Sequence, residues 1–125
     1  MTKIIGGPMT ATGGVVVDED GIGRLVNRTL VNASLSGDTE AVAAQGAGIR
    51  IRVVALYAVA SGAATTKFKS SSTDISPATA FAANGGMVLP RNDHGWFQTA
   101  PNEALNANLN GAIATGFMID WIQAK

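Results

Sequence analysis

From Arg24 onward the side-chain pattern repeats at every second residue in several segments, and this period predicts β-strands. Side chains of a strand point in turn to the two faces of a sheet, whereas a helical face repeats every three to four residues. The longest such stretch covers residues 49–60. Its two predicted faces are Ile49, Ile51, Val53, Ala55, Tyr57 and Val59 on one side, and Arg50, Arg52, Val54, Leu56, Ala58 and Ala60 on the other.

Shorter alternating stretches predict the remaining strands. In residues 25–35, Leu25, Val31 and Leu35 share one face. Residues 39–45 stay open between a short helix and a strand, because their alanines favour helix only weakly. About eight strands with frequent turns predict an all-β fold, namely an antiparallel β-sandwich that is jelly-roll-like. The other predicted strands cover residues 65–70, 87–89, 96–99, 104–110 and 113–123.

The first 23 residues differ in character and predict an extended N-terminal arm. They hold six of the fifteen glycines, which lose much conformational freedom on folding and bury little surface. We therefore divide the chain into a Gly-rich arm, 1–23, and a β-sandwich domain, 24–125. Two apolar patches interrupt the arm, and we expect them to form an interface by adding a strand to a neighbour's sheet. These patches are Ile4, Ile5, Val15, Val16 and Val17.

A low content of charged residues favours self-association and disfavours a nucleic-acid partner. Charged residues make up 14% of the chain and hydrophobic residues 46%, where about 25% charged is usual for a soluble domain. Nine basic and nine acidic side chains give a formal net charge of zero. Binding to phosphates requires a basic excess, whereas low net charge and bare apolar surface promote association. We expect a homo-oligomer that binds no nucleic acid.

The sequence lacks the residues needed for disulfides, for thiolate or calcium sites and for a membrane span. The chain contains no cysteine, which excludes disulfides and thiolate metal sites and fits synthesis in a reducing cytoplasm. No apolar run approaches the roughly 20 residues that span a bilayer, so we expect no membrane partner. Residues 18–21 look briefly like a cation loop, but they lack the ligand spacing and the distal glutamate of a calcium loop. We interpret them as a solvated turn.

Catalytic residues are not recognisable. His94 is the only histidine, and its neighbour Asp93 would suit an oriented general base. The pair lies in a predicted loop with no nucleophile in a recognisable turn, so a solvated histidine is the preferred interpretation. A glycan hydrolase or lyase needs a pair of carboxylates, and Asp74, Glu103 and Asp120 are isolated in the sequence. We predict no enzyme activity, no catalytic residue, no metal and no cofactor.

Aromatic and asparagine side chains supply the other candidate contacts. Trp96, Phe97 and Trp121 are interpreted as core or subunit-interface residues, because a tryptophan buries a large apolar area and is enriched at interfaces. Asn106, Asn108 and Asn110 fall on one face of a strand, where they could form a ladder between subunits. The alternative is a sugar-binding platform made of Trp96, Phe97 and this asparagine face.

A succession of motifs between residues 49 and 122 resembles small virion proteins of tailed bacteriophages and prophages. The most specific part is the asparagine–diglycine turn followed by Gly-Trp-Phe and then Glu-Ala-Leu-Asn. No catalytic residue carries over from this resemblance. The motifs lie in residues 49–54, 67–70, 82–86, 89–90, 95–100 and 103–109, followed by a closing apolar strand.

The resemblance implies a structural role in a virus particle. The first hypothesis is a capsid decoration or cementing protein, with the N-terminal arm clamping it to the major capsid protein on the head surface. The protein would be made in the cytoplasm of the bacterial host and assembled as a homotrimer, the trimer being inferred from the local threefold axes of phage heads. The alternative hypothesis is a tail-fibre or baseplate component that binds host glycans.

Overall fold

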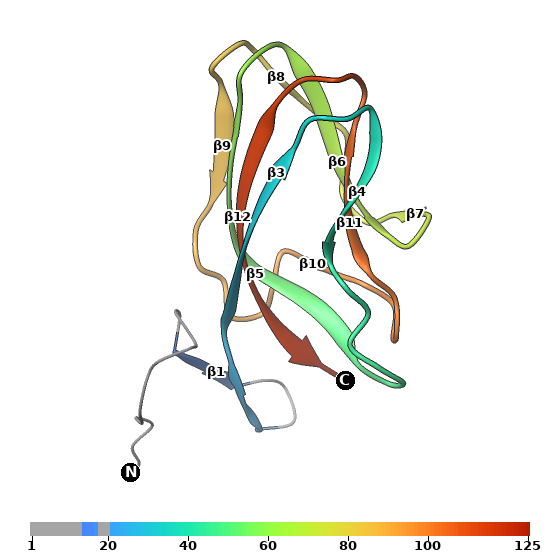
Figure 1. Ribbon diagram of the computed structural model, residues 1–125. Coiled ribbons are helices and arrows are strands. Elements are labelled where there is room, and N and C mark those ends of the chain that lie inside the picture. The colour runs from blue at the N-terminus through green and yellow to red at the C-terminus, as the bar shows by residue number, and fades with distance from the viewer. Residues whose placement is uncertain (1–13, 18–20) are drawn as a thin grey trace.

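Two antiparallel five-stranded sheets pack together in the computed structural model (Figure 1). The structure describes residues 14–17 and 21–125, and within these ranges it contains strands and turns but no helix. The all-β class and the β-sandwich predicted from the alternation are therefore confirmed.

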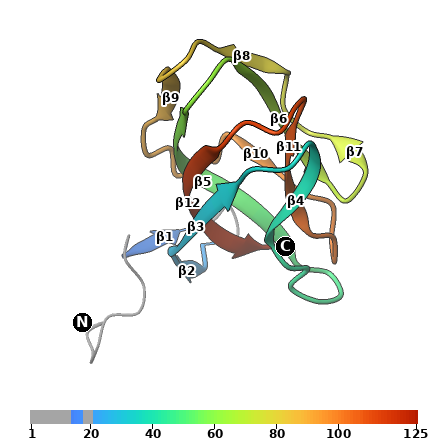
Figure 2. The same cartoon turned by 45° about the horizontal axis from the view of Figure 1, so that its top comes forward.

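Each sheet is built around two long central strands. In the first, called sheet I, the order is β3–β12–β5, and both β9 and β10 pair with the outer edge of β5. In sheet II the order is β4–β11–β6, and β7 and β8 pair with the outer edge of β6. Figure 2 shows the two sheets side by side. Sheet I consists of β3 (Asn27–Ala33), β5 (Arg50–Ala60), β9 (Gly86–Leu89), β10 (Phe97–Gln98) and β12 (Thr115–Ala124), and sheet II of β4 (Gly37–Val42), β6 (Ala64–Ser70), β7 (Thr73–Asp74), β8 (Thr79–Phe81) and β11 (Leu105–Leu109).

The chain crosses repeatedly from one sheet to the other. It does so from β3 to β4, from β4 to β5, from β5 to β6, from β8 to β9, from β10 to β11 and from β11 to β12. Of residues 39–45, left open in the sequence, residues 39–42 belong to β4, where Thr39 pairs with Ala107 of β11 and Val42 is buried, and residues 43–45 follow the strand. Pairing within a sheet therefore overrides the weak helical preference of the alanines.

Three aromatic rings join the sheets at the centre of the core. Phe68 of β6 is almost fully buried and stacks on Phe97 of β10, with ring centroids 5.1 Å apart. It also meets Phe117 of β12 edge to face at 5.4 Å. Since β6 belongs to sheet II and the other two strands to sheet I, these contacts hold the two layers together.

The predicted faces of β5 are correct as far as Val53 and wrong beyond it. Ile51 and Val53 share the core face, but Leu56, predicted on the opposite face, is buried there too, while Tyr57, predicted on the face of Val53, is exposed. Along β12, Trp121 pairs with Val53 and Asp120 pairs with Ala55, so Val54 has no partner. This extra residue is a β-bulge, and it inverts the alternation because side chains repeat with a period of two.

A two-stranded hairpin covers the outer face of sheet I at one end. It consists of β1 (Val15–Val17) and β2 (Gly23–Leu25), and it lies beside the lower end of β3 in Figure 1. Val16 is fully buried in a small second cluster with Val26, Val54 and Ile122. Ile122 lies on the face of β12 opposite to Trp121, which belongs to the main core, so this cluster is on the outer side of the sheet.

The predicted strand 25–35 is wrong at both ends: the hairpin accounts for the end at Leu25, and β3 stops at Ala33, before Leu35. β2 ends at Leu25 and β3 begins at Asn27, with the buried Val26 between them. Val31 faces the core as predicted, but Leu25 and Leu35 are exposed. The change of direction at Val26 breaks the common face that an uninterrupted strand would have had.

Replacement of Phe68 tests the junction between the sheets. A Phe68→Ala substitution removes both ring contacts and leaves a cavity, so we expect the free energy of unfolding to fall by about 3–5 kcal/mol. The control is Leu35→Ala, at a position that is 69% exposed, where the change should stay within about 0.5 kcal/mol. Urea denaturation followed by tryptophan fluorescence measures both. Equal effects of the two substitutions would contradict this account of the core.

Candidate interaction surface

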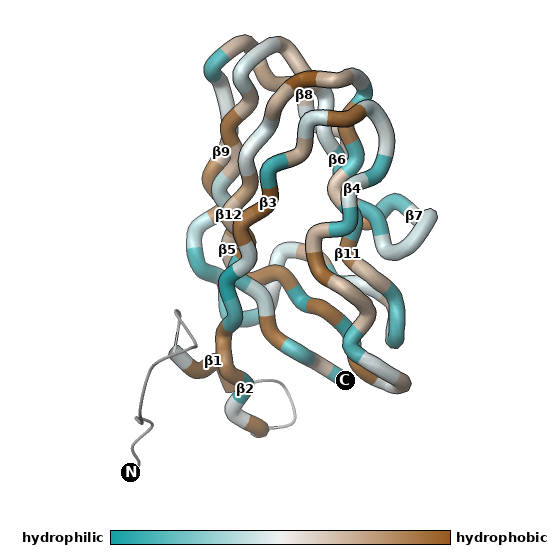
Figure 3. Tube along the Cα trace, in the orientation of Figure 1, coloured by the Kyte–Doolittle hydropathy of each residue, from teal (hydrophilic) through white to brown (hydrophobic). Residues whose placement is uncertain are grey.

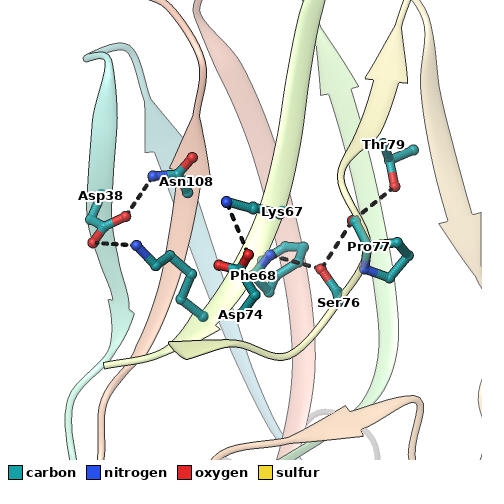
Figure 4. A network of polar contacts seen from close by, with 9 residues as sticks. Asp38, Lys67, Phe68, Asp74, Ser76, Pro77, Thr79 and Asn108 are labelled. Carbon is teal, nitrogen blue, oxygen red and sulfur yellow. Dashed lines mark hydrogen bonds and ion pairs between the residues drawn. The ribbon is translucent and has the colours of Figure 1, made fainter. Parts of the chain in front are cut away.

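The outer face of sheet II is polar, and four of its charged side chains form two ion pairs (Figure 4). Lys67 Nζ lies 3.0 Å from Asp74 Oδ2, and Lys69 Nζ lies 3.5 Å from Asp38 Oδ2. Asn108 Nδ2 donates a hydrogen bond of 2.7 Å to Asp38 Oδ1. This face therefore carries charges of both signs on β4, β6 and β7 and is well suited to contact with water.

The three predicted asparagines make hydrogen bonds within their own chain. Asn106 Nδ2 donates to the Ser71 carbonyl at 3.0 Å, and Asn108 bonds to Asp38 as described. Asn110 Oδ1 accepts a hydrogen bond of 2.9 Å from the Thr65 backbone N–H. These bonds tie β11 and the residues after it to neighbouring strands of sheet II. A ladder between subunits remains a prediction, and these particular atoms do not need one.

The outer face of sheet I is apolar beyond the hairpin. Leu30 of β3, Met118 of β12, Tyr57 of β5 and Val88 of β9 are direct partners across the strands, so they form one row across the sheet. We call these four residues the apolar row. Leu30 is 68% exposed and Val88 65%. Figure 3 shows hydrophobic segments on these neighbouring strands. Such a row cannot be found by sequence alternation, because it depends on the register of four strands and on the bulge in β5.

An ion pair borders the apolar row on one side. Arg28 Nε donates to Asp120 Oδ1 at 2.7 Å, and a second guanidinium nitrogen donates to Asp120 Oδ2 at 3.0 Å. The hydrogen bond to Asp120, and then the charge of that carboxylate, raise the pKa of Arg28 above its ordinary value. The two charges that adjoin the row on β3 and β12 therefore neutralise each other.

A shallow hollow borders the apolar row on its other side. It has a volume of about 210 Å³ and lies over Gly116, between side chains that include Leu30, Tyr57 and Val59. A Cβ atom at Gly116 would meet only Asn32 Oδ1, at 3.7 Å. The hollow therefore exists because the residue at this position has no side chain, and the surrounding space can accept one.

The structure separates Trp121 from the other two predicted aromatic residues, Trp96 and Phe97. Trp121 is buried in the core and donates from Nε1 to Thr29 Oγ1 at 3.0 Å, and Phe97 packs on Phe68. Only Trp96 is substantially exposed, and its Nε1 donates to the Pro90 carbonyl at 2.8 Å. Trp96 and Phe97 together line an apolar groove of about 280 Å³, with Pro77, Met87 and Leu89 among the other lining residues. This groove does not share a surface with the asparagines of β11.

The predicted arm residues divide into three groups. Ile4 and Ile5 lie outside the described residues. Val16 is fully buried against its own chain, whereas its neighbours Val15 and Val17 point to the opposite side of the hairpin and are exposed. Of the three valines, only these two offer surface to another molecule without opening the hairpin.

The acidic residues considered for catalysis each have a different partner, and His94 lies in a turn. His94 is exposed, and its backbone N–H donates to Asn92 Oδ1 at 3.0 Å in a local turn. Asp74 pairs with Lys67, Asp120 pairs with Arg28, and Glu103 accepts a hydrogen bond from Ser70. Within residues 14–17 and 21–125, no three histidine, aspartate or glutamate side chains come together as a metal site would require.

Comparison with known proteins yielded no match to a family model, a curated protein or a solved structure. In the described part of the chain, no helix has the length and hydrophobicity needed to cross a membrane.

A pair of valine substitutions tests the seating of the hairpin. Val16→Asp would bury a carboxylate among Val26, Val54 and Ile122, so we expect the hairpin to detach from the sheet and expose Arg24. Val17→Asp, at a position that is 63% exposed, is the matched control and should leave the hairpin in place. Limited trypsin digestion with mass spectrometry should show faster cleavage after Arg24 in the first variant only. Similar cleavage in both variants would contradict the proposed packing.

Proposed function

We propose that this chain is a structural protein of a tailed-bacteriophage particle, namely a capsid decoration protein that associates with copies of itself. The observation that carries the proposal is the exposed apolar row on a sheet face whose neighbouring charges are already paired. Exposed apolar patches of this kind are typical of surfaces that contact another protein. The motifs between residues 49 and 122 resemble small virion proteins, and this resemblance is the reason for proposing a phage particle as the assembly.

The strand order supports a jelly-roll arrangement of the sandwich. Jelly rolls are double-sheet folds of eight strands, and they occur in viral capsid proteins and in lectins. Here β3–β12–β5–β9 faces β4–β11–β6–β8, and the chain crosses between the sheets at most connections. This order is compatible with both the capsid hypothesis and the glycan hypothesis, so the surfaces must distinguish them.

The surfaces favour the capsid hypothesis over glycan recognition. A sugar site needs several polar groups directed at the ligand. In the Trp96 groove, the indole N–H is bonded to Pro90, and Ser76 Oγ accepts a hydrogen bond of 2.8 Å from the Phe68 backbone N–H. Trp96 and Phe97 both line this groove, but the asparagine face lies elsewhere, so the predicted platform does not form one surface. A tail-fibre or baseplate role remains the alternative.

Removal of residues 1–13 tests attachment to the capsid by the arm. The cut precedes Gly14, because Val16 is part of the fold and a deletion reaching residue 20 would uncover the second cluster. We expect the shortened protein to keep its melting temperature and its number of copies but to lose binding to phage heads that lack the protein. Co-sedimentation with such heads measures this binding. Undiminished binding would contradict attachment by the arm.

Location in the particle separates the two hypotheses directly. An electron-microscopy map of intact particles should show the sandwich on the head surface, with three copies around a local threefold axis if the trimer prediction holds. Density in the tail fibre or baseplate, together with binding to a glycan array that Trp96→Ala abolishes, would instead support the alternative.

A further inference from the structure

We propose that the outer face of sheet I binds a neutral sugar at the end where β3 leads into β4. The site is a hollow of about 330 Å³ lined by Asn32, Ser34, Ser61, Asn84, Val59 and Gly116 among others, and we call it the polar hollow. It uses none of the residues of the predicted Trp96 platform. This inference goes beyond the proposed function and does not depend on where the chain sits in a particle.

The floor of the polar hollow lies over the paired centre of the sheet. Gly116 of β12 pairs with Asn32 of β3 on one side and with Val59 of β5 on the other. Gly116 has no side chain, and the next residue of the chain that points outward, Ala114, has only a methyl group. The surface over β12 is therefore lower than the surface over its neighbours, and it is a small apolar area that the C–H groups of a sugar ring can cover.

Four uncharged polar side chains surround this floor. Asn32 and Ser34 come from β3 and the residue after it, while Ser61 and Asn84 come from the connections next to β5 and β9. The Ser61 backbone N–H donates to the Ala114 carbonyl at 2.9 Å, which fixes Ser61 beside the start of β12. Polar groups therefore lie on both sides of the low middle strand.

These four side chains have hydrogen-bonding capacity to offer a ligand. None of them makes a hydrogen bond within the part of the chain that the structure describes, whereas Asn106, Asn108 and Asn110 all do. Asn32 Oδ1 lies 3.7 Å from the point where a Cβ of Gly116 would stand, so this oxygen is close to the floor. Amide and hydroxyl groups both donate and accept, which matches the hydroxyl groups of a sugar.

Charge and backbone pairing disfavour other classes of ligand. No charged residue is among the described residues that line the polar hollow, so a phosphate group or an acidic sugar finds no counter-charge there. Both β12 and β5 are paired on either side along this length, so a peptide cannot add to the sheet as an extra strand at this point. The class that fits best is a neutral ligand with several hydroxyl groups.

A matched pair of glycine substitutions tests the site. Gly116→Val fills the polar hollow, and its Cβ meets only Asn32 Oδ1, at ordinary contact distance, while valine is favoured in strands. The control is Gly111→Val, where a Cβ meets nothing within 4 Å. On an array of neutral and sialylated glycans, we expect the wild-type protein and the control to bind neutral glycans and Gly116→Val to lose this binding. Unchanged circular dichroism spectra show that both variants fold.

Titration with free sugars locates the bound ligand. With glucose, galactose, mannose and N-acetylglucosamine as probes, we expect nuclear magnetic resonance shifts at the backbone amides of Asn32, Ser61 and Gly116. Asn32→Ala should raise the dissociation constant about ten-fold, because the loss of one hydrogen bond costs affinity by roughly this factor. Ser36→Ala, at an exposed position outside the polar hollow, should leave the constant unchanged.

The outcomes separate this inference from the proposed function. Absence of binding on the array and of shifts with all four sugars would overturn the sugar site and leave the role in the particle untouched. Binding that Gly116→Val retains would also overturn it, and if Trp96→Ala abolishes that binding, the sugar lies in the Trp96 groove. Absence of the protein from particles would overturn the proposed function alone, whatever the sugar binding.

Discussion

The pairing of β5 with β12, including the unpaired residue Val54, determines which side chains face the core and which face outward. Before the bulge, Ile51 and Val53 point into the sandwich; after it, Leu56 does. Without the extra residue, Tyr57 would be directed toward the core and Leu56 away from it. Val54 itself points to the outer face of the sheet, where it packs against Val16 of the hairpin. The buried core, the second cluster and the apolar row therefore all depend on this one irregularity.

The two outer faces of the sandwich have different chemistry although the strands are similar in length. Sheet II presents lysine, aspartate and asparagine side chains that bond to one another. Sheet I presents aliphatic side chains, one ion pair and a covering hairpin. Since an antiparallel sheet commonly keeps one face in water, the wet face of sheet II is the ordinary case. The exposed apolar face of sheet I is the less usual case, and it is the observation on which the proposed self-association rests.

The sequence predicted those parts of the fold that depend on local alternation. β11 and β12 form within the predicted segments 104–110 and 113–123, apart from the last residue of β12, and the alternation along each strand buries Leu105, Phe117 and Trp121. The faces of β5 beyond Val53 were not predictable, because nothing in residues 49–60 marks the bulge, which is seen only in the register of β5 with β12. The hairpin was missed for a related reason, since the burial of Val16 requires Ile122 from the other end of the chain. The candidate surface needed the register of four strands and was not visible in any one of them.

The hairpin also lies where the N-terminal segment joins the sandwich. The Val26 backbone N–H donates to the Gly14 carbonyl at 2.8 Å, so the first described residue is fixed beside the entry to β3. Any mechanical load applied through the residues before Gly14 is therefore transmitted through the β1–β2 pairing and the contacts of Val16 before it reaches the central strands. A tether of this kind would yield at the hairpin while the sandwich stayed intact.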